Sequence, residues 1–163
     1  MIVWGGRNKA SQYFLATHTY YFDGDGDGVG DTAITTVSCS PPSGYVSVGG
    51  DCNDADATIW APPSEVLGDR FADAVTLEWS PPSAPGGVAD VYDVLRSTNP
   101  GDFVGAATCI ATRTAATGAT DPTTPLLGQV FFYLVRADDA CPSGLGSLGT
   151  TSSGTARTGR SCP

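Results

Sequence analysis

The chain has 163 residues, enough for one ordinary domain or for a small domain with an appended module. Its 21 Gly and 12 Pro, beside a single Met, are typical of short strands joined by turns and predict a mainly β protein with almost no helix. The net charge of −9 without a basic stripe argues against a nucleic-acid partner, and no apolar run approaches the ~20 residues of a membrane span, so we expect no membrane insertion.

The first segment, residues 1–19, carries apolar side chains that need cover, among them Ile2, Trp4 and Phe14. It lacks the basic start and the apolar stretch of about 7–15 residues that mark a signal peptide. We therefore expect the chain to be a piece of a longer exported protein. Added to the edge of a neighbour's sheet, the segment would bury these side chains, which makes it a candidate docking strand.

The negative charge is concentrated between Lys9 and Arg70, an interval with no other Lys or Arg. Seven acids fall there in two clusters, which are Asp23, Asp25, Asp27 and Asp31, then Asp51, Asp54 and Asp56. Carboxylates packed without cationic side chains repel one another and resist folding unless an external cation joins them. The pattern therefore predicts a metal-binding module, with a plain Asp-Gly turn as the structural alternative.

The first cluster resembles an incomplete EF-hand loop. Its acids alternate with glycines, which permit the tight curl that a cation requires. Ile34 stands where the EF-hand pattern has its closing bidentate Glu, so the loop alone is short of oxygens. The second cluster is the expected supplier of the missing ligands.

Calcium is the predicted ion, because it binds roughly 6–8 oxygens at about 2.3–2.6 Å, whereas the alternative, magnesium, takes fewer and keeps its waters. Two ions are expected, since the available oxygens exceed one coordination sphere. The predicted ligands are Asp23, Asp25, Asp27, Val29 through its carbonyl, Asp31, Asp51, Asn53, Asp54 and Asp56.

Five cysteines with no Cys-x-x-Cys pair, and the single His18, predict disulfides rather than a zinc site. Disulfides imply an oxidising compartment, so we expect an extracellular or cell-surface location. A bridge between Cys39 and Cys52 would hold the second acidic cluster near the first.

The segment 20–31, followed by Cys39, Tyr45 and the stretch 50–57, resembles the MopE-type metal-binding motif of secreted bacterial proteins. That motif is similar to thrombospondin type 3 calcium repeats. The resemblance covers about residues 20–63 and implies that both acidic clusters bind calcium and that Cys39 and Cys52 form a disulfide. Asn53 stands where Asp is more usual, which would weaken one ligand.

Beyond this module, alternating apolar and polar residues predict a strand at 75–79, and a second strand is expected at 91–96. A third strand at 131–137 is apolar on both faces, which predicts a central position, and the segment 143–160 is expected to contain the last strand. The spacing favours an antiparallel sandwich.

These strands resemble strands B, C and F of an immunoglobulin-like fibronectin type III domain covering residues 64–163. The expected fold is therefore an irregular calcium-stapled loop module, residues 20–63, followed by a fibronectin type III-like β-sandwich. From that topology we expect a Cys109–Cys141 bridge, with pairing of Cys162 to either partner as the alternative.

We expect no catalysis, because a lone His18 beside an acidic loop has no partner for a triad and the carboxylates are assigned to metal. The expected function is that of an extracellular stalk, spacer or adhesion element of a bacterial surface or secreted protein. Its partners would be other domains or copies of the same protein. A homopolymeric filament subunit is the first alternative, and a carbohydrate- or ligand-binding accessory domain with Trp60 as its platform is the second.

Overall fold

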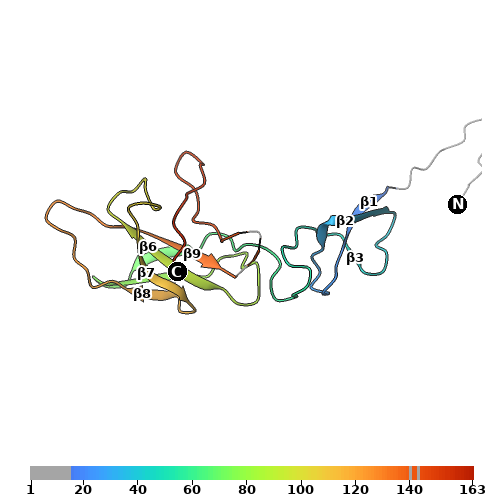
Figure 1. Cartoon of the computed structure of the whole chain (residues 1–163), viewed down its shortest axis with the longest axis horizontal. Helices are drawn as coiled ribbons and strands as arrows, with labels where there is room; N and C mark the ends of the chain where they lie inside the picture. The colour runs from blue at the N-terminus through green and yellow to red at the C-terminus, as the bar shows by residue number, and fades with distance from the viewer. Residues whose placement is uncertain (1–15, 140, 143) are drawn as a thin grey trace, which may run out of the picture.

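The computed structural model describes residues 16–139, 141–142 and 144–163. These residues form nine strands and no helix, so the expectation of a mainly β protein is confirmed. Figure 1 shows a small N-terminal sheet at one end of the molecule and the remaining sheets at the other. The described residues contain no helix with the length and apolar character needed to span a membrane. The candidate docking strand, residues 1–19, falls outside these residues except for residues 16–19.

The N-terminal sheet has the order β2-β1-β3 and was not expected from the sequence. Its strands are β1 (His18–Phe22), β2 (Asp31–Ser38) and β3 (Tyr45–Val46). Only Tyr20 and Gly30 are buried between residues 16 and 50, and Ile34 and Val37 are exposed. A single-layer sheet with so little buried apolar surface gains little from the hydrophobic effect, so other interactions must hold it.

Two antiparallel three-stranded sheets form the larger body, with the arrangement expected of a β-sandwich. One sheet has the order β4-β5-β8, from β4 (Leu67–Phe71), β5 (Thr76–Ser80) and β8 (Gly118–Thr120). The other has the order β7-β6-β9, from β7 (Thr108–Thr114), β6 (Val91–Ser97) and β9 (Phe132–Asp138). The three strands predicted from the sequence are β5, β6 and β9, each within one residue of its expected start.

The main core lies between these sheets. It consists of Val66, Leu77, Trp79, Tyr92, Val94, Val135 and Ala137. Leu77 and Trp79 are buried, while Thr76 and Glu78, which alternate with them, are partly exposed. This is the alternation that the sequence predicted for a strand with one face on a core.

The predicted central position of β9 is wrong, because β6 is the middle strand and β9 lies at the edge among the described strands. Its outer face is covered by the C-terminal segment instead of by a second sheet. A second apolar cluster on that side joins Leu95, Phe103, Ala107 and Leu148. The last strand expected within 143–160 is absent from the described part of that segment, which makes only isolated bridges such as Phe103 with Gly159.

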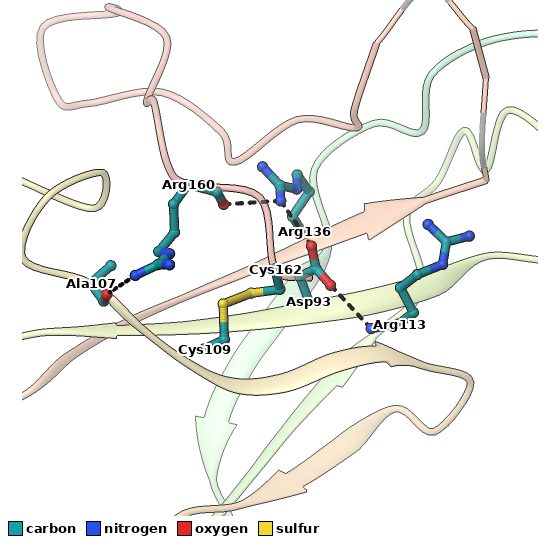
Figure 2. Close-up of a disulfide and its surroundings, with 7 residues drawn as sticks. All are labelled: Asp93, Ala107, Cys109, Arg113, Arg136, Arg160 and Cys162. Atoms are coloured by element: carbon teal, nitrogen blue, oxygen red, sulfur yellow. Dashed lines mark hydrogen bonds and ion pairs between the residues drawn. A yellow bond between two sulfur atoms is a disulfide. The ribbon is translucent and has the colours of Figure 1, made fainter.

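The disulfide between Cys109 and Cys162 fastens the C-terminal segment to β7 (Figure 2). Beside it, Arg136 of β9 forms an ion pair with Asp93 of β6 at 2.8 Å, with side chains only 3% and 4% exposed. The Arg136 guanidinium also donates to the Arg160 carbonyl, and Asp93 accepts a hydrogen bond from the Arg113 amide. The buried pair therefore connects β6, β7, β9 and the C-terminal segment.

Replacing Arg136 with Leu should lower the free energy of unfolding by about 3–5 kcal/mol, because the buried Asp93 carboxylate loses its countercharge. Guanidinium denaturation of the oxidised protein measures this loss. The matched control is Arg70→Leu, which breaks the exposed Arg70–Glu78 pair and should cost less than about 1 kcal/mol. Equal losses in the two variants would show that the buried pair has no special role.

Candidate metal centre

The loop between β1 and β2, residues 23–30, curls because its carboxylates accept hydrogen bonds from backbone amides a few residues ahead. Asp23 Oδ1 accepts from the Gly26 amide at 2.7 Å, and Asp27 Oδ1 accepts from the Val29 amide at 2.7 Å. Gly26 and Gly28 have φ values of 87° and 96°, which L side chains rarely adopt. These bonds leave other carboxylate oxygens of the loop free to bind an external group.

The second acidic cluster lies against this loop. The Gly50 and Asp51 amides both donate to the Gly30 carbonyl, at 3.0 and 3.2 Å. Asp54 Oδ1 accepts from the Gly24 amide at 2.7 Å. The structure thus brings together two clusters that lie twenty residues apart in the sequence.

Two groups of carboxylates result, each with ligand oxygens that all lie within 4.8 Å of one another. The first group is Asp23, Asp25 and Asp27, and the second is Asp25, Asp51 and Asp54. Asp25 belongs to both. Either group has the donor type and spacing to hold a metal ion.

Three of these carboxylates each have one buried oxygen without a hydrogen-bond donor, namely Oδ2 of Asp25, Asp27 and Asp51. Burial raises the pKa of Asp51, and the neighbouring charges of Asp27, Asp25 and Asp54 raise it further. No Lys or Arg forms an ion pair with either cluster in the described part of the chain. The site therefore has a deficit of positive charge, which a cation would correct.

The other predicted ligands are not gathered in the same way. Asp31 Oδ1 accepts from the Ala33 amide, and Asp56 accepts from both the amide and the hydroxyl of Thr58, which lowers the Asp56 pKa. Neither acid belongs to the two groups. For Val29 and Asn53, whose ligand atoms would be neutral oxygens, the metal-binding role stays a prediction.

The predicted Cys39–Cys52 disulfide is wrong. Cys52 pairs with Cys141, and Cys39 is free and exposed. In the β1–β2 register, Asp31 lies beside Phe22 at the loop end, so Cys39, after the eight residues of β2, lies about 25 Å away at the opposite end. A disulfide requires Cα atoms within ~7 Å, which places Cys39 out of reach of Cys52.

The predicted Cys109–Cys141 disulfide is also wrong, and the alternative that Cys162 pairs within the chain is correct. Cys109 lies near the beginning of β7, beside Leu95 in β6. The end of β9, which precedes Cys141, pairs with Val91 at the other end of β6. The prediction failed because it assumed that Cys109 ends a strand.

The Cys52–Cys141 disulfide joins the acidic module to the sandwich, a connection that the sequence did not reveal. Backbone hydrogen bonds reinforce it. The Trp60 and Ala61 amides both donate to the Gly86 carbonyl, at 2.7 and 2.9 Å, and the Val88 amide donates to the Thr58 carbonyl at 2.9 Å. We call residues 58–61 the docking segment. Gly86 and Gly87 are the only sequence signal for it, since both sit where a side chain would collide with the docking segment.

No family model matches the chain, and neither a curated protein nor a solved structure is significantly similar to it. The resemblances to the MopE-type motif and to fibronectin type III domains therefore stay predictions. The two disulfides favour an oxidising, extracellular environment.

Thiol titration of the denatured, unreduced protein should find one free thiol per chain, from Cys39, and peptide mapping should recover the Cys52–Cys141 and Cys109–Cys162 pairs. Cys39→Ser should leave the melting temperature unchanged. Cys52→Ser, made together with Cys141→Ser, should cost about 2–5 kcal/mol, because the bridge closes a loop with a sequence separation of 89. Recovery of a Cys39–Cys52 peptide would contradict this pairing.

Proposed function

We propose that the chain is a calcium-binding, non-catalytic structural module of a secreted or surface protein. The observation that carries this proposal is the set of buried carboxylate oxygens of Asp25, Asp27 and Asp51, which converge from two clusters and have no donor. Desolvated like charges at such short range destabilise the folded chain unless a cation binds among them.

Calcium fits this donor set better than magnesium does. Its large, flexible coordination sphere accepts several carboxylates and backbone carbonyls at once, whereas magnesium keeps its waters and demands octahedral geometry. Two ions are supported by the two carboxylate groups, with Asp25 as the ligand that they share. The resemblance of residues 20–63 to MopE-type and thrombospondin type 3 motifs points to the same ion.

The proposed role of calcium is mechanical. The N-terminal sheet has almost no core, so its order would depend on the bound ions and on the Cys52–Cys141 bridge. Calcium would turn the acidic loop from a source of repulsion into a rigid link at the entrance to a fibronectin type III-like sandwich. A stalk or spacer needs this property.

Other roles have less support. His18 is exposed at the start of β1 and has an edge-on ring contact with Tyr20, with no nucleophile beside it among the described contacts. Trp60, the suggested carbohydrate platform, is half-buried and anchored at the docking segment by its backbone amide. We therefore prefer a structural role to catalysis or sugar binding.

Calorimetric titration of the chelated protein with calcium should give saturable binding and a higher melting temperature. At a free calcium concentration 1,000 times the Kd, the free energy of unfolding should rise by about 4 kcal/mol. Asp25→Asn should abolish most of this gain, since Asp25 belongs to both carboxylate groups. Asp73→Asn is the matched control, because Asp73 is an exposed turn residue outside both groups. The proposal fails if calcium neither binds nor raises the melting temperature of the chelated protein.

A second candidate function is self-assembly into a filament. No described strand pairs with the outer edge of β9, and β4, on the facing sheet, is exposed along its whole length. Between them lies a groove of about 420 Å³, lined by Phe71, Phe103, Tyr133 and Leu134 among others. Phe71 and Tyr133 meet across the two sheets with ring centroids 5.1 Å apart.

The proposed occupant of this groove is the apolar segment 1–15 of a second copy. The strand β1, which follows this segment in the sequence, lies at the end of the molecule remote from the sandwich (Figure 1). An added strand would pair with β9 and bury side chains such as Ile2 and Trp4. This occupant distinguishes a polymer subunit from a monomeric spacer.

Light scattering after size-exclusion chromatography tests this candidate. The unmodified chain should form oligomers, and the Trp4→Asp and Phe71→Asp variants should be monomeric. Ile34→Asp is the control, because Ile34 is an exposed apolar residue outside the groove. If the protein is a monomer at every concentration, filament assembly is rejected and the spacer function remains.

A further inference from the structure

A pair of aspartates stands at the end of the sandwich core, next to the docking segment. Val91 at the start of β6 pairs with Asp138 at the end of β9. Extending that antiparallel register by one residue sets Asp90 opposite Asp139. Directly opposed residues of two strands lie on the same face with Cβ atoms about 4.5–5.5 Å apart, and like charges there are unfavourable.

Neither aspartate is neutralised by a basic side chain in the described part of the chain. Two nearby acids are paired, since Asp93 binds Arg136 and Asp138 binds Arg113. Asp139 is 7% exposed, and its Oδ2 atom has no hydrogen-bond donor, while Oδ1 accepts from the Cys141 amide. Oδ1 of Asp90 is likewise buried without a donor.

The docking segment supplies further oxygens beside Asp139. A Cβ atom built on Gly86 would lie 1.8 Å from the Ala61 carbonyl oxygen and 3.0 Å from Asp139 Oδ2. One built on Gly87 would lie 2.7 Å from the Thr58 carbonyl oxygen and 3.2 Å from the same Asp139 atom. The absence of side chains at both glycines therefore lets a carboxylate and two carbonyls of the docking segment approach one small space.

We propose that Asp90, Asp139 and carbonyl oxygens of the docking segment bind a further hard cation of the calcium type, separate from the acidic loop. Carboxylate and carbonyl oxygens without competing donors are the ligands that such cations select. The ion would sit between the docking segment and the end of the core, and would fix the module to the sandwich together with the nearby Cys52–Cys141 bridge.

The electrostatics of Asp90 and Asp139 agree with this assignment. Burial raises the pKa of Asp90 to about 6, and the charges of Asp139 and then Asp138 contribute to the increase. Burial also raises the pKa of Asp139. Both carboxylates therefore resist ionisation at this position unless positive charge arrives, and a bound cation would keep both of them ionised.

Calorimetric calcium titration of the full-length, chelated chain tests the proposal through stoichiometry. The double variant Asp90→Asn, Asp139→Asn should bind one calcium equivalent fewer than the unmodified chain and retain the equivalents of the acidic loop. The reciprocal variant Asp25→Asn should lose loop equivalents and retain the junction equivalent. Asp73→Asn, the exposed control, should bind the full number.

These outcomes separate the junction site from the loop site, so either can fail alone. An unchanged stoichiometry in the double variant would overturn the proposal, and would mean that the two carboxylates share a proton instead. If the double variant does not fold, the single variant Asp90→Asn, which keeps the buried Asp139, replaces it in the titration. This variant should also bind one calcium equivalent fewer than the unmodified chain. Terbium luminescence excited through the Trp residues gives an independent count of bound ions, expected to fall by the same one equivalent.

Discussion

Repulsion among unpaired carboxylates governs the N-terminal half of this molecule. Asp25, Asp27 and Asp51 each have a buried oxygen without a hydrogen-bond donor, in a region with almost no apolar core. Folding of the loop around its own amides brings these charges together, because each backbone hydrogen bond to one carboxylate oxygen fixes the other oxygen in place. Backbone hydrogen bonds therefore account for the arrangement of the loop carboxylates, and the proposed cation would neutralise their charge.

In the sandwich, arginines of the same chain neutralise the buried carboxylates. Asp93, Asp121 and Asp138 are as deeply buried as any acid in the loop, yet each forms an ion pair with Arg136, Arg96 or Arg113. The hydroxyl of Tyr133 adds a further donor to Asp121. The sandwich thus buries its carboxylates beside internal guanidinium groups, whereas the acidic loop has no such partner and is proposed to use an external ion. Asp90 and Asp139 stand where the two halves meet, and no Lys or Arg in the described part of the chain forms an ion pair with them.

The sequence was informative wherever a property is local. Alternation in Val75–Trp79 identified β5, and the spacing of the acids identified the carboxylates that the structure gathers into the candidate metal centre, because periodicity and ligand spacing are visible within a few residues. The strands β1 and β2 were missed since their side chains are mostly exposed on both faces and show no such alternation. Disulfide pairing was mispredicted twice, because it depends on which ends of distant strands coincide. The central position assigned to β9 failed for a similar reason, as its second apolar face meets an irregular segment instead of a sheet.

The Cys52–Cys141 bridge also determines how the molecule transmits tension. When the chain is pulled along its length, the covalent path runs from Cys52 directly to Cys141, and the intervening residues form a closed loop that cannot add to the contour length. All six described strands of the sandwich, β4 through β9, belong to that loop and are shielded from the load. The load is carried by the N-terminal sheet with its acidic loop and by the C-terminal segment beyond Cys141. Because the N-terminal sheet has almost no apolar core, the resistance of the described chain to stretching depends on its least apolar part.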